Sequence, residues 1–183
     1  LLAIHSVSRD QIEGAIIASV VPQVLNPVKT ALKKLFGKPV MVVGPGIKTG
    51  LNIRIDNPAQ TGAELVVSCV AALKLQKPPL IVIGMGTATT MMVLDETGAM
   101  IGGSISPGIR VSMDALTQRA ALLPGLQLDQ PKRTIGRNTV ECMRSGILYG
   151  AASMLDGMIE RMEQEKPGVS YIIFTNDLVR AKE

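Results

Sequence analysis

The sequence predicts an α/β protein built around a mixed β-sheet. Three apolar strands in the middle of the chain, a long helix after them and a last strand near the end support this prediction. The three strands fall within residues 80–107, with turns at Met85-Gly86 and at residues 95–98. Short glycine-containing turns typically join antiparallel strands. We therefore expect a three-stranded antiparallel meander at the centre of the sheet.

The segment before the meander predicts two short strands with a helix between them. Residues 14–21 and 39–43 are short apolar runs rich in β-branched residues, a pattern typical of buried strands. The intervening helix is expected to open at Asn26-Pro27 and to end at Gly37, because glycine commonly terminates helices.

A second helix is expected over residues 58–75, with Asn57 as its cap. Proline favours the first helical position, where its missing N–H costs nothing, and Pro58 occupies that position. One apolar face of this helix would consist of Leu65, Val66, Cys69, Val70 and Leu73.

After the meander the sequence predicts two helices and a strand. A helix is expected over residues 111–121, and a longer one over 138–165. The longer helix begins with Asn138 and Glu141 in capping-box spacing. Residues 169–175 predict the last strand. A three-stranded meander followed by crossover helices is characteristic of the ribonuclease-H-like lobe.

We expect two lobes of this kind. Residues 79–183 would form the second lobe, incomplete at its end, and residues 1–78 a truncated first lobe; the abrupt start at Leu1 suggests a fragment. Small residues recur along the long helix and leave one smooth face, which fits internal helix packing as well as a dimer seam. They are Gly146, Gly150, Ser153 and Gly157.

Composition argues against several classes of protein. The 183 residues are 46% hydrophobic, which is not the composition of a disordered chain. A formal net charge of +4 without a dense basic run, and only 2% aromatic residues, argue against nucleic-acid binding. No apolar run approaches the roughly 20 residues of a membrane-spanning helix. Cys69 and Cys142 are expected to be reduced core thiols of a cytoplasmic protein, and with His5 as the only histidine no zinc site is expected.

The turn between the first two meander strands is a candidate phosphate-binding site. Gly84 and Gly86 allow the backbone to approach an anion closely. Thr87, Thr89 and Thr90 supply hydroxyl donors beside them. Glycine- and threonine-rich hairpins also occur in ordinary sheets, so the pattern alone leaves both interpretations open.

Two helix starts carry further candidates. Glu64 would serve as a general base if it faced the hairpin across a cleft, but Thr61 and Glu64 also fit a capping box. The cluster Arg137-Asn138-Thr139 stands at the start of the long helix. It fits either a binding site for a ligand carboxylate or amide, or a plain helix cap.

Together these stretches resemble the signature of type III pantothenate kinases, a family that also includes regulatory proteins called Bvg accessory factors. The matching stretches follow the family order and spacing over nearly the whole chain. They are GAIIASVVP (14–22), VVGPGIKTGLNIRIDNP (42–58), TGAE (61–64), GTATT (86–90), GGSISPG (102–108), ALT-x-R-x-A-x-LP (115–124) and IGRNTVECMRSGILYG (135–150).

The resemblance implies an actin-like ATPase fold with duplicated ribonuclease-H-like lobes. It implies phosphorylation of the primary alcohol of pantothenate by ATP, which gives 4'-phosphopantothenate in the first step of coenzyme A biosynthesis. It also implies a cytoplasmic homodimer that uses ATP, Mg²⁺ and a monovalent cation, K⁺ or NH₄⁺.

Site residues follow from the resemblance position by position. Thr87 matches a threonine that contacts ATP, with Gly86 and Ala88 on either side of it. Glu64 stands where the family has its catalytic aspartate. The substrate-binding positions are Gly62, Ala63, Glu64, Leu65 and Thr139.

Several departures from the family pattern stand at these same positions. Glu64 replaces the catalytic aspartate, and Leu65 replaces an arginine suited to an anionic substrate. Gly84 occupies the position of the cation-binding aspartate and has no side chain to act as a metal ligand. The family's N-terminal Asp-x-Gly-Asn-Thr loop is absent from the sequence, and Phe-Thr-Asn-Asp at 174–177 replaces its Thr-Gly-Gly segment.

These departures leave alternatives to the kinase open. One is a catalytically inactive, dimeric regulatory or binding relative of the family. Another is a kinase or ATPase of the same superfold that acts on a different substrate, because fold alone does not determine substrate.

Overall fold

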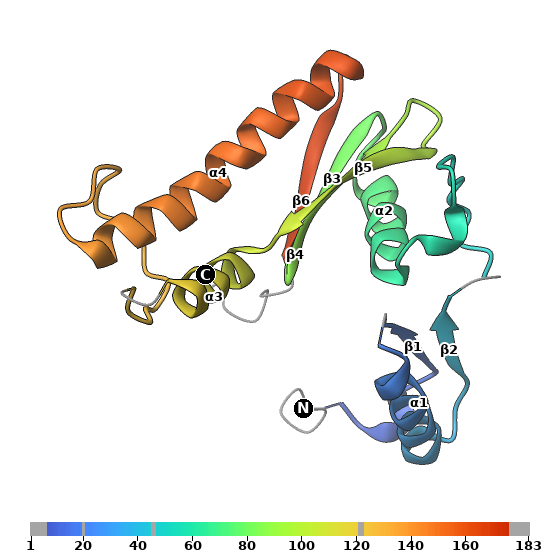
Figure 1. Ribbon diagram of the computed structural model, residues 1–183. Coiled ribbons are helices and arrows are strands. Elements are labelled where there is room, and N and C mark those ends of the chain that lie inside the picture. Colours follow the sequence, from blue (N-terminus) through green and yellow to red (C-terminus); the bar gives the residue numbers. More distant parts are fainter. Residues whose placement is uncertain (1–6, 20, 45–46, 121–122, 176–183) are drawn as a thin grey trace.

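The computed structural model describes residues 7–19, 21–44, 47–120 and 123–175 (Figure 1). It contains a four-stranded sheet in the order β5-β4-β3-β6 and a separate two-stranded sheet, β1-β2. The predicted α/β class is confirmed. The strands are β1 (Ala15–Ala18), β2 (Val40–Val43), β3 (Leu80–Met85), β4 (Ala88–Leu94), β5 (Met100–Pro107) and β6 (Ser170–Thr175). The helices are α1 (Pro22–Phe36), α2 (Ala63–Leu75), α3 (Ile109–Arg119) and α4 (Thr139–Glu165), with 3-10 turns at Arg9–Gln11 and Pro58–Gln60.

Strand β3 is the core of the larger sheet. Its first four residues, Leu80 to Ile83, are at most 2% exposed. Side chains alternate between the two faces of a strand, so Leu80 and Val82 pack with α2 and Ile81 and Ile83 pack with α4. A strand that is apolar on both faces requires cover on both sides. The sheet accordingly lies between α2 and α4 (Figure 1).

The order of the strands follows the predicted meander. β3 pairs antiparallel with β4, and β4 pairs antiparallel with β5. The chain then passes through α3 and α4 before β6 pairs parallel with β3, with Leu80 opposite Ser170. Parallel pairing requires such a long crossover, so the long helix and the last strand are explained together. Both predictions are confirmed.

The start of helix α1 differs from the prediction. The helix begins at Pro22, not at Asn26, and Pro27 lies inside it. Pro22 takes the first helical position, where a missing N–H costs nothing. Pro27 removes one hydrogen bond near this end, and the helix continues past it. The predicted end is confirmed, because Gly37 terminates the helix with a left-handed φ of 61°.

Helix α2 begins later than predicted. Residues 58–60 form a separate 3-10 turn preceded by Asn57, and α2 itself starts at Ala63 with Gly62 as its N-cap. No side chain caps α2, so the capping box considered for Thr61 and Glu64 is wrong. Glu64 lies at the second helical position, whereas a capping box requires the third. The apolar face is confirmed by the burial of Val66 and Cys69.

Helix α3 begins at Ile109, two residues before the predicted start, and ends at Arg119; the predicted end at residue 121 lies outside the described residues. The predicted cap of α4 is confirmed, because Asn138 Oδ1 accepts the Glu141 N–H at 2.9 Å. The Glu141 carboxylate accepts the N–H of Arg137 at 3.0 Å instead of the N–H of Asn138. This backbone hydrogen bond is the main cause that lowers the pKa of Glu141.

The turn between β4 and β5 is held by the carboxylate of Asp95. Its Oδ1 accepts hydrogen bonds from the Thr97 hydroxyl at 2.6 Å, the Thr97 N–H at 2.9 Å and the Ala99 N–H at 3.0 Å. Its Oδ2 accepts from Arg54 at 3.2 Å. These bonds favour the charged form and lower the pKa of Asp95, the Thr97 hydroxyl most of all. The same carboxylate thus ties the turn to the segment around Arg54.

We expect Asp95→Ala to destabilise the protein at pH 7 and much less at pH 3. A carboxyl whose pKa is lowered on folding stabilises the fold above its unfolded pKa of about 3.9, and this contribution is lost as the pH falls through the folded pKa. The urea midpoints of both proteins at the two pH values measure the difference. Asp156→Ala, an exposed change on α4, is the control. An equal loss at both pH values would contradict the assignment.

Candidate functional site

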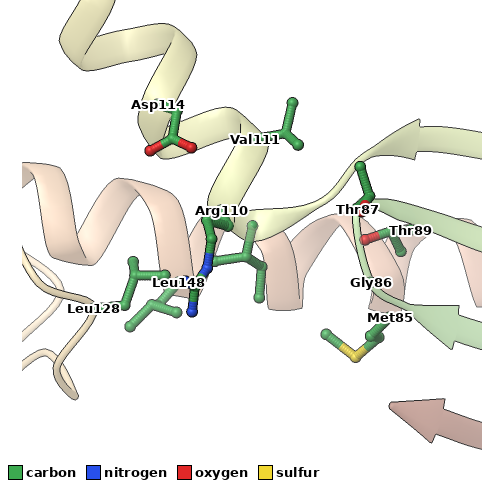
Figure 2. Close-up of a pocket in the computed structure, with 10 residues that line it drawn as sticks. Met85, Gly86, Thr87, Thr89, Arg110, Val111, Asp114, Leu128 and Leu148 are labelled. Atoms are coloured by element: carbon green, nitrogen blue, oxygen red, sulfur yellow. The ribbon is translucent and has the colours of Figure 1, made fainter. Parts of the chain in front are cut away.

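A cavity of about 470 Å³ lies at the turn between β3 and β4, and we call it the hairpin cavity. The hairpin forms one wall, α3 another, and the loop before α4 and α4 itself contribute one leucine each (Figure 2). Its volume is within the usual range of small-molecule sites. The lining residues are Met85, Gly86, Thr87, Thr89, Ile109, Arg110, Val111, Asp114, Leu128 and Leu148.

Gly108 fixes the start of α3 over the hairpin turn. Its N–H donates to the carbonyl oxygen of Thr87 at 2.9 Å. A Cβ atom at this position would collide with the carbonyl oxygens of Gly86 and Thr87. Only glycine permits so close a backbone approach. The contact places the first turn of α3 directly beside the predicted phosphate-binding turn.

Two threonines of the hairpin differ in their surroundings. Thr87 is exposed at the turn, whereas Thr89 is only 4% exposed. Thr89 has the same orientation along β4 as Met91 and Val93, so it faces the side of the sheet that α4 covers. Figure 2 shows its hydroxyl directed toward the cavity. The hairpin therefore offers the cavity hydroxyl groups, as the sequence predicted.

Arg110 is a cavity residue that sequence reasoning missed. Its guanidinium group extends into the cavity toward Leu128 and Leu148, and Asp114, one turn later on α3, also lines the cavity (Figure 2). Arg110 lies in the first turn of α3, which contains no acidic residue and no side-chain cap. A basic residue at the positive end of a helix is unfavourable on its own. An arginine in an uncapped first helical turn, directly after Pro-Gly, is therefore the sequence signal that could have identified Arg110.

A second cavity, of about 620 Å³, lies between α3 and α4, and we call it the α3–α4 groove. It contains Thr139, one of the predicted substrate-binding residues, and adjoins the hairpin cavity at Ile109. Gly146 and Gly150, which belong to the smooth face of α4, line this groove and are exposed.

A third cavity, of about 970 Å³, lies at the start of α2. It contains the predicted substrate-binding residues Gly62 and Ala63, together with Lys48 of the preceding loop. Thr61 also lines it, and its hydroxyl is buried without a hydrogen-bond partner in the described residues. This third cavity is the only one of the three that α2 lines.

The structure thus distributes the predicted site residues over separate places. Gly86 and Thr87 line the hairpin cavity, and Thr139 lines the α3–α4 groove. Glu64 is exposed in the first turn of α2 and lines none of the three cavities. Neither Leu65 nor Ala88 lines any of them. The role of Glu64 as a base remains a prediction.

The position predicted for a cation ligand does not fit a cation. Gly84 lies in β3 opposite Thr90, and an added Cβ would be 2.7 Å from the Thr90 hydroxyl oxygen. Over the described residues, no group of three or more histidine, cysteine, aspartate or glutamate side chains is placed to hold a metal ion. Among the residues that line the hairpin cavity, Asp114 is the one with a carboxylate that could bind a metal ion.

The two cysteines are both free, but only one lies in the core. Burial raises the pKa of the Cys69 thiol from 9.0 to about 12. Cys142 is exposed and lines the α3–α4 groove, so the prediction that it is a core thiol is wrong. It lies on the face of α4 that borders the groove, which a simple apolar pattern does not reveal. No helix in the described part of the chain combines the length and the apolar character needed to cross a membrane.

Comparisons with known proteins agree on one family. A family model described as type III pantothenate kinase matches residues 1–161. A type III pantothenate kinase of Exiguobacterium sp. is 45% identical over 96% of this chain and 69% of that protein. Those of Halalkalibacterium halodurans and Moorella thermoacetica are each 43% identical over 92% of this chain and 66% of their own length. The chain therefore spans about two thirds of the curated relatives it matches.

A solved structure agrees with the fold. The crystal structure of a conserved Baf family protein from Campylobacter jejuni superposes with a TM-score of 0.54 at 15% sequence identity. The match covers 91% of this chain and 70% of that one. At this level of identity the similarity concerns the fold alone.

We expect Gly108→Ala to lower the free energy of unfolding by about 1–3 kcal/mol, the usual cost of overpacking. The added methyl group meets backbone carbonyl oxygens, which cannot move aside as the end of a side chain can. Urea unfolding followed by circular dichroism measures the change. Gly125→Ala, where the new atom has no neighbour within 4 Å, is the matched control. Equal midpoints for the two variants would exclude the close contact at the turn.

Proposed function

The chain belongs to the type III pantothenate kinase family, and from this we propose that it phosphorylates pantothenate with ATP. The product would be 4'-phosphopantothenate, the first intermediate of coenzyme A biosynthesis. Family membership supports the reaction and the substrate. The observation that carries the proposal within the chain is the hairpin cavity, where Thr87 stands at the position of the family's ATP-contacting threonine.

We also propose the actin-like arrangement of two ribonuclease-H-like lobes. The meander β3-β4-β5, followed by a helical crossover to the parallel strand β6, supports a lobe of this kind over residues 79–183. Residues 1–78 would then belong to the first lobe. The protein would act as a cytoplasmic homodimer, and the exposed glycine face of α4 supports a contact between copies.

Phosphoryl transfer requires mainly positioning and charge stabilisation. The turn at Gly86, Thr87 and Ala88 would hold the phosphates of ATP through its backbone and the Thr87 hydroxyl. Mg²⁺, when bound with ATP, offsets the charge of the phosphates, and it usually takes only one or two protein carboxylates. Asp114 is the residue that would provide one in the hairpin cavity.

Glu64 would accept the proton of the pantothenate alcohol as its oxygen attacks the γ-phosphorus of ATP. The new bond joins that oxygen to phosphorus, and the bond between phosphorus and the departing ADP oxygen breaks. Gly62, Ala63, Leu65 and Thr139 would bind the pantothenate. Helix α2 and the hairpin cavity lie on opposite faces of the sheet. We therefore propose that the complete site also includes groups that do not belong to the described residues of a single chain.

One observation favours the second candidate, a catalytically inactive dimeric relative with a regulatory or binding role. Glu64 is solvent-exposed and lines none of the three cavities. Leu65 beside it cannot form the charged hydrogen bonds that an arginine would give an anionic substrate. A scaffold that retains nucleotide binding without transfer would have these properties.

We expect the purified chain to phosphorylate pantothenate in the presence of ATP, Mg²⁺ and K⁺. Glu64→Ala should lower kcat about 10²- to 10⁴-fold, the usual contribution of a general base. Production of ADP and of phosphopantothenate measures the rate, and Glu160→Ala on α4 is the matched control. If the folded chain binds ATP but transfers no phosphate, the inactive alternative is correct.

We expect turnover to be the same when K⁺ is replaced by Na⁺, because Gly84 provides no ligand. Gly84→Asp combined with Thr90→Ala, which removes the hydroxyl that the new side chain would meet, should introduce K⁺ dependence. Initial rates at several K⁺ concentrations give the result, with Thr90→Ala alone as control. A strong K⁺ requirement of the unaltered chain would show that another group holds the cation.

A further inference from the structure

Arg110 and Thr89 both line the hairpin cavity, from two different elements, α3 and β4. We propose that the Arg110 guanidinium and the Thr89 hydroxyl bind the phosphate chain of the nucleotide in this cavity. This inference rests on the proposed function, adds Arg110 to it, and assigns a contact to Thr89, one of the hydroxyl donors that the sequence pattern indicated. The resemblance to the family assigned a role to Thr87 in this region, but none to Arg110 or Thr89.

The charge of Arg110 is not balanced within the described part of the chain. The ion pairs there involve Arg54, Arg133, Arg144 and Lys166, and none involves Arg110. Asp114 lines the same cavity one helical turn after Arg110 but forms no ion pair with it. An arginine without a carboxylate partner, directed into a cavity, is suited to bind phosphate, which it can contact with two parallel N–H groups.

Thr89 provides a second and independent observation. Three polar or charged side chains are buried among the described residues: Thr89, Asp95 and Ser145. Asp95 accepts hydrogen bonds from Thr97, Ala99 and Arg54, and Ser145 donates to the Thr134 carbonyl. The Thr89 hydroxyl forms no hydrogen bond within the described residues, although the residue is only 4% exposed and lines the cavity. Thr89 is not among the side chains whose polar atoms are closed off without a partner, so its hydroxyl is open to the cavity and can donate a hydrogen bond to a bound phosphate oxygen.

Arg110 lies at the N-terminal end of α3, where the helix dipole is positive. The first turn of α3 contains no acidic residue and no side-chain cap, so its free N–H groups and the guanidinium repel one another. A bound anion offsets this repulsion, because both the helix terminus and the arginine attract the anion. Gly108 keeps this end of the helix against the hairpin turn. The geometry is therefore fixed before a ligand arrives.

The shape of the cavity agrees with this ligand. Leu128 and Leu148 lie beside the Arg110 guanidinium on one side of the cavity, and Met85 lies near the two threonines at the hairpin end (Figure 2). A ligand that contacts both Arg110 and Thr89 must therefore extend across the cavity, as an extended phosphate chain would.

The test is the binding of ATP, ADP and adenosine to the purified chain by isothermal titration calorimetry. Arg110→Ala should weaken ATP binding about 10- to 100-fold, the range expected for charged hydrogen bonds. Arg110→Lys should weaken it less, since the charge remains but the paired N–H groups do not. Thr89→Val should weaken it about tenfold. Adenosine, which has no phosphate, should bind all variants equally.

Arg119→Ala is the matched control, because it removes the same charge from the last turn of the same helix and does not line the cavity. Circular dichroism verifies that each variant is folded. The inference is overturned if Arg110→Ala binds ATP as tightly as Arg119→Ala does, or if the unaltered chain binds no ATP. A chain that binds ATP through Arg110 but transfers no phosphate to pantothenate supports the inference and refutes the proposed function.

Discussion

The architecture depends on one constraint, which is that β3 must be covered on both faces. Its apolar residues alternate between the two sides of the sheet, so no orientation of the strand leaves a polar face for water. Helix α2 covers one side and α4 the other. The hairpin at the end of β3 is therefore attached to a strand that is buried over its first four residues, and the cavity beside it receives walls from β4, α3 and α4.

Much of the fold could be predicted because its signals are local. The strands of the meander and the final strand have apolar runs bounded by glycine or proline, and Asn138 with Glu141 marks the start of α4. The errors at α1 and α2 also have local causes. Pro22 begins helix α1, which continues past a second proline. The residues at 58–60, which resembled the start of α2, form a separate 3-10 turn.

The site was only partly predictable because its parts meet across the fold. The glycines and threonines of the hairpin predicted an anion site, and Gly86 and Thr87 do line a cavity. The local pattern around Arg110 marks an unusual helix start, but which cavity its side chain enters depends on the contact between Gly108 and a turn more than 20 residues earlier. The place of Glu64 depends on where α2 begins, and a shift of a few residues along a helix turns a side chain to another face.

The packing of α2 has a consequence for how the molecule would bend. Cys69 and Ala72 belong to the core of the larger sheet, and so does the preceding segment, where Ile53 pairs with Met100 and Arg54 binds Asp95. Any displacement of α2 relative to β3 would therefore have to break this shared core. Gly62 at the start of α2 and Thr87 in the turn after β3 would accordingly keep a nearly constant separation.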